Sequence, residues 1–117
     1  MPPPVLSGYG EGGFRVSGEF LTGSILLLPD RAAPWSAASL ADASIENLAS
    51  VFTAEPRPEL LLIGCGRQIM FAPPALRAAI KGQGLALEVL DTGAACRTYN
   101  VLLAEGRRVA AALIALG

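Results

Sequence analysis

Histidine is absent from this chain of 117 residues. Because histidine is the commonest general base and metal ligand, its absence excludes Ser-His and Cys-His catalytic pairs and histidine-bound metals. The two cysteines, Cys65 and Cys96, are too few and too far apart for a zinc framework, a CxxC redox pair or a disulfide scaffold. We therefore expect no metal, no cofactor and a reducing environment.

Charged residues are also scarce, at 16% of the chain against 52% hydrophobic residues, where about 25% charged is typical. A net charge of −1, with no basic cluster beyond Arg107-Arg108, leaves no footprint for nucleic acid. No apolar run approaches the ~18 residues of a membrane span, and the start Met1-Pro2-Pro3-Pro4 lacks the pattern of a signal peptide. The composition predicts a cytoplasmic protein with an uncharged surface that is suited to a protein partner or a homodimer.

The length fits one α/β domain over residues 1–117, with a flexible tail over residues 1–8. Four glycines within residues 8–13 predict a loop. An N-terminal β-hairpin follows, because Ser17-Gly18 separates two short segments of alternating apolar residues. The continuous apolar run of residues 24–28 predicts a strand that is buried on both faces.

A first helix is expected from the helical spacing of Ile45, Leu48 and Phe52, with Asp42 as its N-cap. Next come a buried strand over residues 60–63, a helix that Pro73-Pro74 opens, and a strand over residues 85–90. This order predicts a βαβ unit with two parallel strands.

A third helix should span about residues 94–104, with Thr92 as its cap and Gly106 in a left-handed conformation at its end. The last segment, residues 109–116, is ambiguous from periodicity alone. We expect a strand, because Gly106 separates it from the helix and Val109, Leu113 and Ile114 suit a sheet, although its alanines also fit a helix.

Ligands in open α/β sheets bind at the carboxyl ends of parallel strands, which places Gly64-Cys65-Gly66 beside Asp91-Thr92-Gly93. These two loops are the candidate binding cleft. Glycines of this kind also simply let a strand turn, and the segment lacks the complete dinucleotide and P-loop motifs.

The candidate nucleophile is Cys96, because the start of a helix and the adjacent Arg97 lower a thiol pKa; packing as a small apolar residue is the stronger alternative. Asp91 suits a general base or an ordinary helix cap. Arg97 and Asn100 share one face of the third helix and suit a polar ligand, a partner backbone or solvent.

One long segment resembles a known family: Asp91-Thr92-Gly93-Ala94-Ala95-Cys96-Arg97-Thr98-Tyr99-Asn100 and its continuation to Val109, together with Leu62-Ile63-Gly64-Cys65-Gly66, Tyr9-Gly10 and Trp35. The chain is similar to the small domain-of-unknown-function family that includes the mitochondrial complex I assembly factor and the vertebrate adipogenesis-associated protein. The resemblance implies a three-layer α/β domain around a mixed sheet, with the last segment a strand that runs antiparallel to its neighbours. It implies no catalytic residues and no cofactor.

Three functions are consistent with the sequence. The leading hypothesis is a non-enzymatic assembly or interaction module, which the resemblance links to the biogenesis of a respiratory, complex I-like membrane complex. The second is a small-molecule-binding or thiol-dependent enzyme that uses Cys96, Asp91 and Arg97 around the cleft. The third is a self-associating structural protein, since an apolar surface also serves a homodimer.

Overall fold

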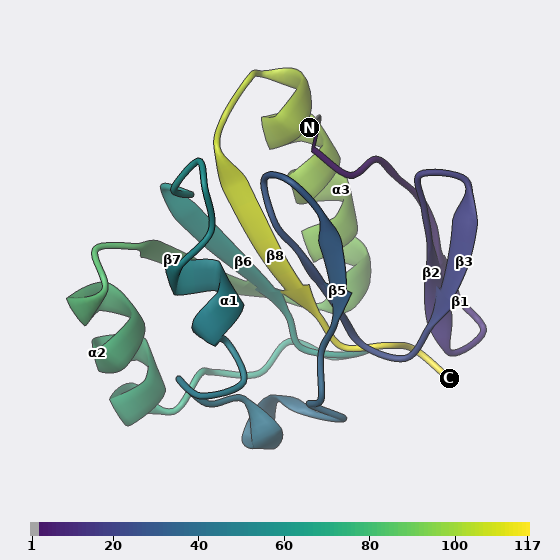
Figure 1. Cartoon of the computed structure of the whole chain (residues 1–117). Helices are drawn as coiled ribbons and strands as arrows, with labels where there is room; N and C mark the ends of the chain where they lie inside the picture. Colours follow the sequence, from purple (N-terminus) through teal and green to yellow (C-terminus); the bar gives the residue numbers. More distant parts are fainter. Residues whose placement is uncertain (1–2) are drawn as a thin grey trace.

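A computed structural model describes residues 3–117 and contains two β-sheets with helices around the larger one (Figure 1). The smaller sheet has the order β1-β2-β3 and the larger sheet has the order β5-β4-β8-β6-β7. The strands are β1 (Leu6–Gly10), β2 (Gly13–Val16), β3 (Glu19–Thr22), β4 (Ile25–Leu27), β5 (Ala32–Pro34), β6 (Leu60–Gly64), β7 (Ala86–Leu90) and β8 (Val109–Leu113). The helices are the 3-10 turn η1 (Leu40–Asp42), α1 (Ala49–Phe52), α2 (Pro74–Gly82) and α3 (Thr92–Ala104).

The predicted hairpin is confirmed as β2 and β3, which pair antiparallel around Ser17-Gly18. Both turn residues have positive φ, at 48° and 87°, the conformation that matches the right-handed twist of the two strands. The predicted glycine loop is corrected, because Leu6–Gly10 form β1 and pair with β2. The predicted flexible tail over residues 1–8 therefore does not extend to residues 6–8, and its first two residues lie outside the part of the chain that the structure describes. The glycines lie within β1 and in the tight turn at Glu11-Gly12, where both residues have positive φ. Leu6 and Phe14 are buried and attach the small sheet to the core.

The central strands β4, β8 and β6 of the larger sheet are buried on both faces, as the continuous apolar runs of residues 24–28 and 60–63 predict. On one face, α1 and α2 cover a cluster that includes Val51, Leu76 and Ile80. On the other face, α3 and the small sheet cover a cluster that includes Phe14 and Tyr99. Both clusters draw on alternate residues of β8 (Figure 1). The three-layer α/β fold is therefore confirmed.

The direction of the last strand needs a correction. β8 is antiparallel to β4 but parallel to β6, so it is not antiparallel to both neighbours. The reason is that α3 carries the chain from the end of β7 back along the sheet, so β8 starts at the same end as β6 and β7. The predicted βαβ unit of β6, α2 and β7 is confirmed, and β7-α3-β8 is a second one.

The predicted first helix is mostly absent. Asp42 does not cap it; its Oδ2 accepts hydrogen bonds from the backbone N–H groups of Ala38 and Ser39 and completes a capping box at the start of η1 instead. Ser44 and Asn47 then exchange side-chain to backbone hydrogen bonds at 3.0 and 3.1 Å. This reciprocal pattern is a capping box, so Ser44 rather than Asp42 starts the helical segment. Its first turn is irregular, and regular helix covers only Ala49–Phe52.

Candidate functional site

The two loops of the predicted cleft lie against each other. Gly64-Cys65-Gly66 follows β6, and Asp91-Thr92-Gly93 joins β7 to α3. The N–H of Cys65 donates to the carbonyl of Leu90, and the N–H of Thr92 donates to the carbonyl of Gly66, both at 2.8 Å. Parallel pairing of β6 with β7 therefore continues past the strand ends into the loops.

Thr92 occupies the space between these loops and is fully buried. Its Oγ1 donates to the carbonyl of Ile114 at 2.8 Å and accepts from the N–H of Gly66 at 3.0 Å. A Cβ placed on Gly64 would lie 3.0 Å from the Thr92 Cα, so glycine is what permits this close approach. The hydroxyl thus joins both loops and the end of β8, and the junction is packed protein rather than an open cleft.

The cap of α3 is Asp91 and not Thr92. The Oδ1 of Asp91 accepts from the N–H of Ala94 at 2.9 Å, in the usual geometry of an N-cap. This bond satisfies one of the free N–H groups at the start of the helix. Asp91 is therefore engaged in stabilising α3, as the alternative of an ordinary cap predicts.

Cys96 is 3% exposed and packs with Ala95 and Tyr99 in the core. Burial raises the pKa of its thiol to about 12; Arg97 opposes this and Asp91 adds to it. The expectation that the helix start lowers this pKa is wrong, because desolvation of the thiolate outweighs the nearby charge. At neutral pH the thiol stays protonated and is a poor nucleophile.

Cys65 is also buried and free. Its Sγ lies 3.3 Å from both the carbonyl oxygen of Gln68 and the backbone nitrogen of Met70. The S–H can donate to that carbonyl while the sulfur accepts from the N–H of Met70. Cys65 thereby holds the start of the loop that follows β6.

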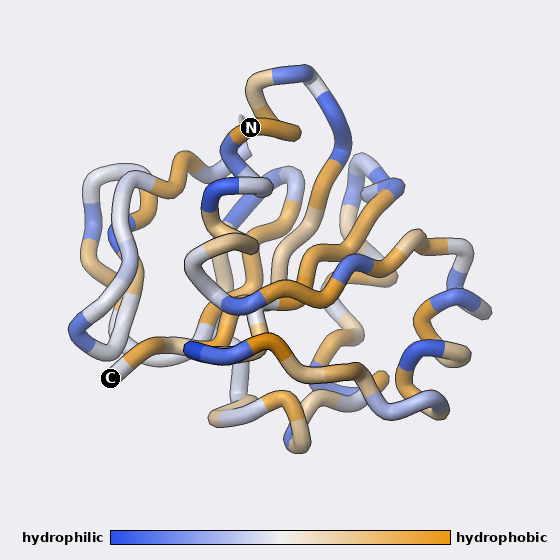
Figure 2. The backbone as a smooth tube through the Cα atoms, turned by 180° about the vertical axis from the view of Figure 1, so that it is seen from behind, coloured by the Kyte–Doolittle hydropathy of each residue, from blue (hydrophilic) through white to orange (hydrophobic). Residues whose placement is uncertain are grey.

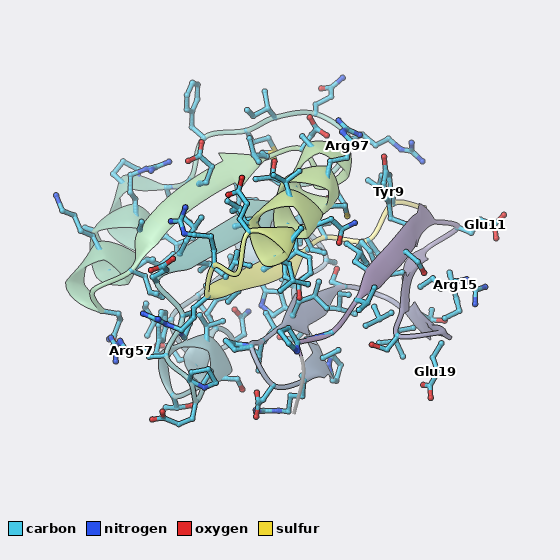
Figure 3. The ribbon with its side chains drawn as sticks, turned by 90° about the horizontal axis from the view of Figure 1, so that it is seen from above. Tyr9, Glu11, Arg15, Glu19, Arg57 and Arg97 are labelled. Atoms are coloured by element: carbon cyan, nitrogen blue, oxygen red, sulfur yellow. The ribbon has the colours of Figure 1, made fainter. Side chains whose placement is uncertain are left out.

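The polar side chains of α3 contact the N-terminal segment of this same chain. Asn100 Nδ2 donates to the carbonyl of Leu6 at 2.9 Å, and the Tyr99 hydroxyl donates to the carbonyl of Pro4 at 2.8 Å. Arg97 Nη1 donates to the Tyr9 hydroxyl at 3.3 Å, and Figure 3 shows these two side chains meeting between α3 and β1. Asn100 therefore binds the backbone of β1 in its own chain.

Sequence reasoning missed an exposed apolar loop between β6 and α2. The exposed fractions are 67% for Ile69, 52% for Met70 and 97% for Phe71. In Figure 2 this loop runs along the outside of the molecule and carries an orange, hydrophobic stretch. The sequence does contain a signal for this loop, namely a run of three apolar residues outside any predicted helix or strand. Such an exposed run is unfavourable in a folded protein unless it serves a function.

Residues 3–117 were also compared with the requirements of a metal site and of a membrane-spanning helix. No group of three His, Cys, Asp or Glu side chains comes together there in a way that could hold a metal ion. None of the helices in this part is both long and apolar enough to cross a membrane.

Comparisons with known proteins agree with the fold. The family model described as "Protein of unknown function (DUF498/DUF598)" matches residues 6–114. An uncharacterized protein of Rhodobacter capsulatus is 37% identical over 93% of this chain and 82% of that protein. NADH dehydrogenase [ubiquinone] 1 alpha subcomplex assembly factor 3 of Danio rerio is 36% identical over 94% of this chain, which spans 63% of that factor. A crystal structure described as an outer membrane protein from Bartonella henselae superposes with a TM-score of 0.91 and 34% identity, covering 99% of this chain and 98% of that one.

Proposed function

Since the chain belongs to the DUF498/DUF598 family of proteins of unknown function, we propose that it is a non-enzymatic interaction module. In this proposal it assists the biogenesis of a respiratory, complex I-like membrane complex by binding a protein component of that complex or of its assembly intermediates. The relatives named as assembly factors for NADH dehydrogenase support this role.

The observation that carries the proposal is the loop of Ile69, Met70 and Phe71, which we call the apolar loop. Single exposed apolar residues are common on protein surfaces, whereas contiguous ones mark sites of interaction. Phe71 is 97% exposed and would gain most from burial in a partner's pocket, because large aromatic side chains act as anchors of interfaces. Cys65 and the prolines that start α2 hold the two ends of the loop.

The contacts of the candidate catalytic residues favour this function over an enzyme. Asp91 caps α3, Thr92 joins the two loops, and Cys96 has a raised pKa in the core. A thiol-dependent reaction would need a thiolate that a substrate can reach. The expected cytoplasmic location stays part of the proposal, and cell fractionation would test it.

Affinity capture from the source cell after mild crosslinking tests the proposed function. The informative variant is Ile69→Ser with Phe71→Ser, which makes the apolar loop polar without touching the core. Val101→Ser is the matched control, because Val101 is 56% exposed on α3. We expect the natural chain and the control to recover the same stoichiometric partner, and the loop variant to lose it.

Two results would contradict the proposal. One is a natural chain that repeatedly comes out with no stoichiometric partner. The other is a loop variant that retains the same partner as the control. The mass of the purified chain in solution separately tests the self-associating alternative, since a homodimer has twice the mass of the monomer.

A further inference from the structure

β7 forms one edge of the larger sheet. The N–H of Ala86 donates to Glu59, and the carbonyl of Leu90 accepts from Cys65, so these two residues of β7 face β6. Because backbone groups alternate in direction along a strand, the N–H and C=O groups of Leu87 and Val89 point away from the sheet. No strand within residues 3–117 pairs with that side. β7 therefore presents four backbone groups to an incoming strand.

A groove runs beside this edge, between β7 and α2. Its lining includes Arg77 and Lys81 of α2 and the apolar residues Leu85 and Leu87, and it is an open depression of about 500 Å³. The two cations are four residues apart and both are exposed, so they lie on the same side of the helix. Neither forms a salt bridge within the described part of the chain. The groove is thus positively charged although the whole chain has a net charge of −1.

The charges around β7 disfavour a second copy of this chain as the occupant. Antiparallel pairing of two β7 strands in the register that joins Leu87 to Val89 of the other copy would satisfy all four backbone groups. That register also places the two Glu88 side chains directly opposite each other, and like charges in that position are destabilising. It further brings the cationic helices of both copies to the same side of the joined sheet.

The geometry points to β7 and the basic groove as the docking site for an extended, acidic segment of a partner protein, which adds as a sixth strand beside β7. Main-chain hydrogen bonds to Leu87 and Val89 supply binding, and carboxylates facing Arg77 and Lys81 supply selectivity. The existence of this protein partner rests on the proposed function, and the site adds that the partner is recognised through an extended, acidic segment. The apolar loop precedes α2 and is available for further contact.

A purified, ¹⁵N-labelled chain tests this site with defined peptides. The probe is an acetylated octapeptide of alternating valine and glutamate, and its counterpart has lysine in place of glutamate. We expect the glutamate peptide to shift the amide signals of Leu87 and Val89 and to slow their exchange with deuterium. Affinity should fall with added salt, because the charges are exposed.

Arg77→Glu is the informative variant and Arg15→Glu is its matched control. Arg15 is an exposed arginine on β2. Arg57 donates to the carbonyl of Gln83 just after α2 and so marks the end of the helix that carries Arg77. Figure 3 shows Arg15 on the opposite side of the molecule from Arg57. Since an exposed charge pair contributes up to about 1 kcal/mol, we expect Arg77→Glu to weaken binding of the glutamate peptide about fivefold. Arg15→Glu should leave the affinity unchanged.

Three results with the peptides would overturn the inference. They are no response of Leu87 and Val89 at millimolar glutamate peptide, equal or tighter binding of the lysine peptide, and equal weakening by Arg15→Glu. Protection of both amides in a peptide-free dimer would also overturn it, because a second copy would then occupy the edge. None of these results decides whether the proposed function is correct, because the affinity-capture experiment tests that function through the apolar loop.

Discussion

Replacing Thr92 by valine tests whether the junction of the two loops is a structural element. The side chain keeps its shape and loses only the hydroxyl, which joins the carbonyl of Ile114 to the N–H of Gly66. The carbonyl of Ile114 would then be left without its partner in the core, while the half-buried N–H of Gly66 would lose its acceptor. The buried carbonyl costs about 2 kcal/mol when unsatisfied, the half-buried N–H about 1 kcal/mol, and the added methyl group offsets about 1 kcal/mol, so we expect a loss of about 2 kcal/mol in the free energy of unfolding.

Urea unfolding, followed by the fluorescence of Trp35, measures this loss. With an m-value of about 1.5 kcal/mol per molar urea, the midpoint should fall by about 1.3 M while the slope stays unchanged. Thr98→Val is the control, because Thr98 lies on the same helix and its side chain makes no hydrogen bond with residues 3–117. It should cost less than about 0.5 kcal/mol. A loss below about 1 kcal/mol in Thr92→Val would refute the reasoning and leave room for water or a ligand at the junction.

Three further predictions concern α3. Gly106 has a φ of 77°, so Gly106→Val should lower the free energy of unfolding by about 2 kcal/mol, and an unchanged urea midpoint would show that the helix tolerates another ending. Tyr99→Phe removes the hydrogen bond to Pro4 and should cost about 1 kcal/mol; no loss would mean that this bond does not hold the N-terminal segment. Burial raises the pKa of Cys96 from 9.0 to about 12, so in this range the unfolded state loses its proton first. Stability should therefore fall as the pH rises from about 9 to about 12, and urea midpoints across this range should fall less steeply in Cys96→Ala.

The candidate site shows why sequence reasoning located residues correctly and assigned their roles less well. It placed Gly64-Cys65-Gly66 beside Asp91-Thr92-Gly93, because parallel strands end at the same edge of a sheet. It did not predict that Thr92 would point at the carbonyl of Ile114, since that residue is 22 positions away in the sequence. The raised pKa of Cys96 likewise depends on which face of α3 is buried, and periodicity cannot weigh desolvation against a nearby charge.

Within the fold, the failures occurred where local and tertiary interactions compete. The apolar spacing around Leu48 predicted a longer helix, but the segment after the Ser44 cap forms irregular turns and becomes regular helix only over Ala49–Phe52. The glycines of residues 8–13 predicted a loop, yet Leu6–Gly10 form β1 because they pair with β2, and Asn100 of α3 adds a hydrogen bond to the carbonyl of Leu6. For β1, hydrogen bonds to neighbouring elements therefore outweigh the weak intrinsic preference of its glycines.

The sequence by itself determined the elements with strong local signals. These are the hairpin turn at Ser17-Gly18, the buried strands β4 and β6, the proline start of α2 and the glycine end of α3, because each depends on backbone geometry or continuous apolarity. Only the tertiary structure decided the direction of β8, the closed junction at Thr92, and the exposure of β7 and Phe71. These features depend on which elements become neighbours, and burial of side chains from distant parts of the chain makes that choice.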